Sequence, residues 1–114
     1  METLTIQEVC GWFEANLDKN ILIKKEEQND IDQVEIALQN VGLMSHSDSI
    51  DDYLSPQAIL LHGSGFIFQL DDDDKQPLPG DSFEIPLNGN FHGYQDENGM
   101  EINTEAASYS IKIQ

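Results

Sequence analysis

Residues 21–44, ILIKKEEQNDIDQVEIALQNVGLM, decide which fold this chain adopts. The segment opens with an apolar run that, between Asn20 and Lys24, is typical of a short strand. The polar run KKEEQND at residues 24–30 then predicts a turn. A lone strand is unstable, so the residues after this turn determine whether the first strand has a hairpin partner.

The residues after the turn, QVEIALQNVGLM, fit two different periodicities. The helical spacing is carried by Ile31, Val34, Leu38 and Val41. The strand spacing is carried by Val34, Ile36 and Leu38, which alternate with more polar residues. Composition favours a helix, because Glu, Ala, Leu and Gln are good helix formers. We favour the strand, since a hairpin is the shortest way to pair the first strand, and a helix over this segment stays the alternative.

The N-terminal residues predict a helix. Thr5 and Glu8 have the spacing of a capping box, in which each side chain bonds the backbone N–H of the other residue. An apolar stripe at helical spacing follows and would face the core. The stripe consists of Ile6, Val9, Cys10, Phe13 and Leu17. Trp12 lies off the centre of this stripe, which indicates the rim of the core or, as the alternative, an interface.

From Ala58 onwards the pattern is that of a β-rich half. Apolar runs at residues 58–62 and 66–70 are separated by Gly63-Ser64-Gly65, where we expect a turn or a bulge. Residues 82–87 alternate between polar and apolar side chains, as a strand does. Pro86 indicates a strand end or an edge strand, because proline has no N–H to donate to a ladder.

Two Asn-Gly dipeptides predict hairpin turns further along this half, at residues 88–89 and 98–99. If the second dipeptide is the two-residue turn, Gln95 faces Ile102. The final strand would then point Tyr109 towards the core, together with the two isoleucines that follow it at alternate positions.

Together these patterns predict an α+β fold in a single domain, residues 1–114. We expect an N-terminal helix packed on a mainly antiparallel β-meander of about five to seven strands. A chain of 114 residues suits one domain and needs neither disulfides nor metal to build its core.

The net charge of the chain limits the classes of molecule that it could bind. There are 22 Asp and Glu against five Lys, there is no Arg, and the formal net charge is −17. Twelve acids and three lysines fall in residues 1–57, so the acidity is spread over both halves. Such a field repels nucleic-acid phosphates and anionic lipids and attracts basic protein surfaces. We expect a basic protein partner, no direct binding of nucleic acid and no membrane contact.

No residue pattern matches a catalytic or metal-binding motif. The three histidines lack the spacing of a zinc site. Neither Asp71 nor Asp96 is followed by the glycine and glutamate that an EF-hand loop requires. Cys10 lies inside the predicted helix, where we expect a packing thiol. We therefore expect no enzyme, no cofactor and no metal; a catalytic site would need His62 or His92 to meet a buried carboxylate.

The stretch LDDDDKQPLPGD, residues 70–81, holds the densest charge. Consecutive carboxylates repel one another and are tolerated in solvent or against a cationic partner. A solvated loop is one interpretation, and a binding loop is the other. For the second interpretation, the predicted partner-binding residues are Asp71, Asp72, Asp73, Asp74, Asp81, Asp51 and Asp52.

These observations predict a small acidic binding protein that masks a basic protein surface. Its concrete forms are an immunity protein or inhibitor of a nuclease-type toxin, or a DNA mimic. The N-terminus lacks the pattern of a signal peptide and no apolar run is long enough for a membrane span, so we expect a cytoplasmic protein.

The alternative is a structural or accessory domain whose acidity only serves solubility. It would form a homodimer through an exposed strand edge near Pro86, or it would bind a small ligand within the sheet. A ligand pocket of that kind would be lined by Phe66, Phe68, Phe83 and Tyr94.

Overall fold

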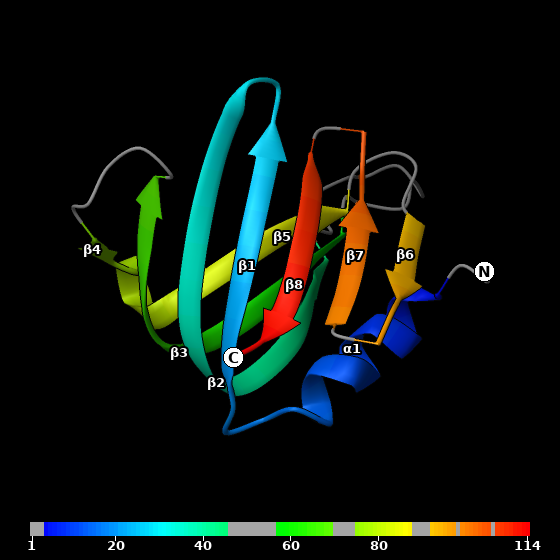
Figure 1. Cartoon of the computed structure of the whole chain (residues 1–114). Coiled ribbons are helices and arrows are strands. Elements are labelled where there is room, and N and C mark those ends of the chain that lie inside the picture. Colours follow the sequence, from blue (N-terminus) through cyan, green and yellow to red (C-terminus); the bar gives the residue numbers. More distant parts are fainter. Residues whose placement is uncertain (1–3, 46–56, 70–74, 88–91, 98, 106) are drawn as a thin grey trace, which may run out of the picture.

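The computed structural model describes residues 4–45, 57–69, 75–87, 92–97, 99–105 and 107–114. Within these ranges one N-terminal helix packs on a mostly antiparallel sheet of eight strands, which confirms the predicted α+β fold (Figure 1). The elements are α1 (Ile6–Glu14), β1 (Asn20–Glu27), β2 (Asp30–Ser45), β3 (Gln57–Gln69), β4 (Gln76–Pro77), the 3₁₀ turn η1 (Pro79–Asp81), β5 (Ser82–Leu87), β6 (His92–Gln95), β7 (Gly99–Asn103) and β8 (Ser108–Ile113).

Helix α1 begins at the predicted capping box. The Thr5 hydroxyl accepts from the Glu8 backbone N–H at 3.1 Å, and the Glu8 carboxylate accepts from the Thr5 N–H at 2.9 Å. Val9 and Phe13 are fully buried, so the predicted stripe faces the core. Trp12 is half-buried and meets the Phe13 ring edge-on with centroids 5.4 Å apart, which confirms its place at the rim.

The β1–β2 hairpin is present, and the helix considered for residues 31–43 is not formed. Ile21 pairs with Ile36 and Ile23 pairs with Val34, and all four side chains are buried. The strand periodicity prevails over helix propensity because it places each of these side chains on the core face.

Strand β2 continues far beyond the hairpin and pairs with β3 along the length of both strands. The register of this ladder shifts between Leu38 and Asn40, where β2 carries a bulge. Gly63-Ser64-Gly65 does not break the chain into two strands, so of the two expectations the turn is wrong. The bulge is present at this place in the ladder, between the Leu38–Gly63 and Asn40–His62 pairs. The glycines instead let the backbone of β3 lie close to that of β2 on either side of Ala37.

A bulge bends the strand that carries it, and β2 curves strongly along its length in Figure 1. The strand order is β4-β3-β2-β1-β8-β7-β6, and β5 pairs with the first half of β3. In Figure 1, β5 and the first half of β3 cross behind β1 and β8, and α1 lies near the lower end of the sheet. The core fills the space between these layers. It is built from Val9, Phe13, Ile21, Ile23, Val34, Ile36, Leu38, Ile59, Leu61, Leu78, Ile85, Leu87, Met100, Ile102, Ala107, Tyr109 and Ile111.

Two strand predictions are refined by the pairing. In the described part of the chain β5 has a single neighbour, β3, so Pro86 lies on an edge strand as predicted. In the β6–β7 hairpin, Gln95 faces Met100, and the register that placed Gln95 opposite Ile102 is wrong. The Asp96 carboxylate accepts from the Gly99 N–H at 2.8 Å and sets the turn one residue earlier.

The described part of the chain contains no helix of membrane-spanning length. Helix α1 has nine residues, and no helix among the described residues is long and apolar enough to cross a membrane.

The β2–β3 ladder gives the first testable prediction. An alanine Cβ at Gly65 would collide with the carbonyl oxygen of Glu35 and crowd the Ile36 backbone, whereas at Gly42 on β2 it would meet open space. We expect Gly65→Ala to lower the free energy of unfolding by about 1–3 kcal/mol. Gly42→Ala should change it by less than about 0.5 kcal/mol. Urea denaturation measures both, and equal losses would contradict this account of the glycine.

Candidate functional site

Most of the predicted partner-binding residues lie outside the described ranges. These are Asp51, Asp52, Asp71, Asp72, Asp73 and Asp74. Asp81 is described: it is exposed, ends η1, and donates its backbone N–H to the Leu78 carbonyl oxygen at 3.2 Å. The role of these seven aspartates therefore stays a prediction.

Other carboxylates gather where β1 turns into β2. Glu26 and Glu27 end β1, Asp30 and Asp32 begin β2, and Glu27 pairs with Asp30 across the hairpin. Asp32 is half-buried, and the other three residues are exposed. The Lys25 ammonium contacts the Glu27 carboxylate at 3.3 Å. Four carboxylates and one lysine leave this hairpin tip with a net negative charge.

A fifth carboxylate lies at the same end of the sheet. Glu105 is in the turn between β7 and β8, and Ser108 just after this turn pairs with Glu26 (Figure 1). Gln69, the last residue of β3, pairs with Asp32, and the aspartate run begins two residues later in the sequence, at Asp71. We call Glu26, Glu27, Asp30, Asp32 and Glu105 the acidic end.

Few of these charges are neutralised within the molecule. Among the described residues, lysines form ion pairs with two carboxylates, those of Glu27 and Glu35. The second pair joins Lys75 to Glu35, three residues beyond Asp32 on β2, at 3.4 Å, and the Lys75 ammonium is also 5.1 Å from the centre of the Phe68 ring. The acidic end therefore presents largely uncompensated carboxylates to solvent or to a cationic partner.

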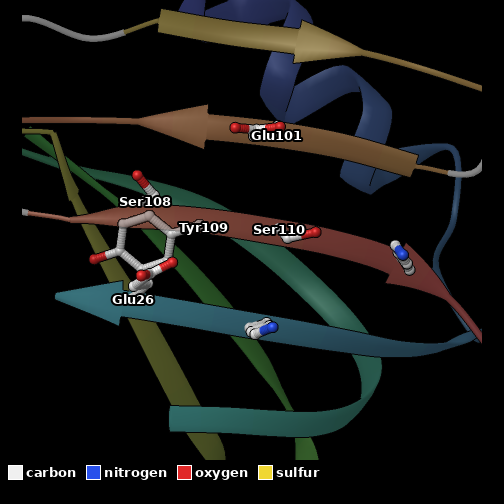
Figure 2. Close-up of a pocket in the computed structure, with 7 residues that line it drawn as sticks. Glu26, Glu101, Ser108, Tyr109 and Ser110 are labelled. Carbon is white, nitrogen blue, oxygen red and sulfur yellow. The ribbon is translucent and has the colours of Figure 1, made fainter. Parts of the chain in front are cut away.

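A second feature lies on the outer face of the sheet, opposite the core. A hollow of about 240 Å³ runs over β1, β8 and β7, and we call it the outer-face hollow (Figure 2). Strand β8 runs between the other two and contributes Ser108, Tyr109 and Ser110 to the lining, and the two serine side chains are short. Longer side chains surround these serines. They are those of Lys24, Glu26, Glu101 and Lys112.

Tyr109 lies on the core side of β8 and is 2% exposed. Burial raises the pKa of its hydroxyl to about 12, and the nearby negative charges of Glu27 and Glu84 add to this increase. The phenol therefore stays neutral where an exposed tyrosine would ionise.

The groups considered for catalysis are not brought together. His62 lies on β3 and His92 on β6, with four strands between them in the sheet. Burial raises the pKa of the Cys10 thiol and the Glu14 charge raises it further, which fits a packing thiol. In the described ranges no three His, Cys, Asp or Glu side chains form a group that could hold a metal ion.

The aromatic pocket considered for the accessory-domain alternative is also not assembled. Phe66 and Phe68 share the face of β3 that carries Glu35 on the neighbouring strand, and Phe66 is exposed. Phe83 on β5 packs against the core instead.

Sequence reasoning missed the acidic end and the outer-face hollow. The acids between residues 26 and 32 are evident in the sequence, but their local pattern indicates only a polar turn. These acids lie near Glu105 only because β1 pairs with β8, and paired residues such as Glu26 and Ser108 are far apart in the sequence. The alternation of serines with Tyr109 predicts strand β8. The hollow, however, also needs the side chains of Lys24 and Glu26 on β1 and Glu101 on β7, and the sequence of β8 does not reveal these neighbours.

Tyr109 gives a testable pH dependence. The folded state keeps this hydroxyl protonated up to a pKa of about 12, whereas an unfolded tyrosine ionises near its ordinary value of 10.0. Its contribution to stability is therefore complete below pH 10 and is lost as the pH rises towards 12, by on the order of 2–3 kcal/mol. Urea denaturation between pH 9 and 12 should show this loss in the natural chain and a smaller one in Tyr109→Phe. Parallel losses would contradict the assignment.

The chain is similar to known proteins over almost its whole length. Residues 2–114 match the family described as YmzB-like protein. Over 116 aligned positions the chain is 34% identical to the uncharacterized protein YmzB of Bacillus subtilis (strain 168), and the alignment covers 96% of each protein. No solved structure matches the chain. The chain therefore belongs to the YmzB-like protein family.

Proposed function

We propose that this protein is a cytoplasmic binding protein that uses its acidic end to cover a basic surface of a protein partner. The observation that carries the proposal is the gathering of five carboxylates at one end of the sheet, where the ion pair seen among the described residues is that of Lys25 with Glu27. A cluster of one sign on a framework of paired strands is suited to electrostatic steering of a basic partner.

The backbone at the acidic end supports this proposal. Glu26 and Glu27 are held by pairing with β2, and Glu26 is also paired with Ser108 of β8. Side chains on paired strands lose less conformational freedom on binding than side chains on an unpaired loop. Carboxylates held in this way favour a partner with several lysines or arginines in fixed positions.

The most concrete form of the proposal is an inhibitor or immunity protein for a nuclease-type toxin, or a DNA mimic. A nuclease or nucleic-acid-binding protein carries a basic surface for phosphates, and carboxylates spaced along strands would occupy it. The proposal assigns no enzymatic activity to the chain. It also excludes direct binding of nucleic acid or lipid, because a net charge of −17 repels phosphate groups.

The test uses basic proteins encoded beside this gene, titrated with the full chain at 50 and 500 mM salt. One variant carries Glu27→Gln, Asp30→Asn and Asp32→Asn, and should weaken binding at low salt by at least about tenfold. A matched control changes charge equally elsewhere on the surface. It carries Glu14→Gln, Asp18→Asn and Glu97→Gln, and should bind nearly as well as the natural chain.

Two results would contradict the proposal. If both triple variants weaken binding equally, the overall charge acts and the acidic end does not. If no basic neighbour binds at low salt, the acidity serves solubility, as in the alternative. A third variant, Asp71 to Asp74 all changed to Asn, measures whether the aspartate run shares the contact.

A further inference from the structure

The outer-face hollow holds charges of both signs on an otherwise acidic protein. Lys24 pairs with Ser110, and Lys112 pairs with Leu22, so the two lysines lie diagonally across the β1–β8 ladder. Glu26 lies two residues beyond Lys24 on the same face of β1, and Glu101 pairs with Ser110 from the other side. In Figure 2 the Glu26 and Glu101 side chains lie on opposite sides of β8, with Ser108 and Ser110 between them.

These charges do not neutralise one another. Among the described residues, neither Lys24 nor Lys112 forms an ion pair, although Glu26 and Glu101 line the same hollow. The Glu101 carboxylate accepts a bond from the Asn103 amide at 3.4 Å, and this contact leaves its charge in place. Two like charges that are diagonal neighbours on a sheet repel each other, so an anionic group between the lysines would remove a destabilising contact.

The shape of the hollow follows from side-chain length. Ser108 and Ser110 alternate on the outer face of β8, while the strands on either side carry lysine and glutamate. A second, smaller hollow of about 120 Å³ shares Lys24, Ser110 and Lys112 and extends the space towards Gln33 on β2. These volumes are below those of drug-sized sites and suit a ligand of few atoms that is held by polar groups.

We propose that the outer-face hollow binds a small zwitterion of the length of a dipeptide. Its carboxylate would lie at Lys24 and Lys112, its ammonium group at Glu26 and Glu101, and its amide over the serine hydroxyls. A simple anion is disfavoured by the two glutamates and by the net charge of −17, and a simple cation is disfavoured by the two lysines. A zwitterion is neutral overall and neutralises both pairs.

The spacing of the charges selects the length of the ligand. Residues two apart on one face of a strand have Cα atoms about 6.8 Å apart, so the backbone positions that carry the Lys24 and Glu26 side chains are separated by this distance. The two charged groups of a single amino acid share one carbon and are too close together to reach both. One additional residue adds roughly 3.5 Å and makes a dipeptide such as diglycine the better match.

The experiment titrates the full chain with diglycine, glycine, acetate or methylammonium and follows the backbone amides by NMR. Diglycine should shift amides of β1 and β8 around Lys24 and Ser110 with a millimolar dissociation constant, and glycine should bind at least about threefold more weakly. Acetate and methylammonium should leave these amides unshifted at the same concentrations. Equal shifts with acetate, or no shift with diglycine at tens of millimolar, would overturn the proposal.

Variants separate this site from general electrostatics. Lys24→Gln with Lys112→Gln should weaken diglycine binding by at least about fivefold. Lys19→Gln with Lys75→Gln removes the same charge outside the hollow and should bind diglycine normally. Ser110→Val keeps every charge, and valine favours strands. Its larger side chain would fill the bottom of the hollow, so the amide shifts caused by diglycine should also disappear. Normal binding by the first or the third variant would overturn the proposal.

Discussion

The pairing of β2 with β3 is the interaction on which the rest of the structure depends. Strand β2 pairs with β1 near its start and with β3 along almost its full length, and it changes direction at the bulge between Leu38 and Asn40. The ladder thereby carries both strands from one layer of the curled sheet into the other. Because apolar side chains alternate along it, Val34, Ile36 and Leu38 reach the core from one half, and Ile59 and Leu61 reach it from the other. Weakening this ladder would separate the two layers that enclose the core.

The alternation of the strands also explains how a chain of charge −17 folds. Among the described residues, Asn16 and Tyr109 are the buried residues whose side chains carry a polar group, and the Asn16 amide donates to the Trp12 carbonyl oxygen at 2.7 Å. The described charged residues lie at the surface or are half-buried, on the outer face, at strand ends and in turns. Their mutual repulsion is therefore screened by water and salt rather than acting across a core of low dielectric. The same arrangement leaves the carboxylates available for an external partner.

Local sequence signals were sufficient for much of the fold. The capping box of α1, the apolar alternation of β1 and β2, and the position of Pro86 on an edge strand each depend on residues close together in the chain. The pairing of strands that are distant in the sequence cannot be predicted from such local patterns. The glycines at 63 and 65 indicate a turn or a bulge from local pattern alone, because their close contact with the β2 backbone can be inferred only when the neighbouring strand is known. Likewise, the acidic end and the outer-face hollow both need β8 beside β1, and no local pattern indicates that pairing.

Hydrogen exchange along β2 tests most directly whether this ladder unites the two layers. Amides on both sides of the bulge, such as those of Ile36 and Leu43, should exchange through global unfolding and should report the same opening free energy. Denaturant should lower both opening free energies with the slope of the whole molecule. If amides beyond the bulge open at a clearly lower free energy, together with those of β5, the two layers are separate cooperative units and the ladder does not hold them together.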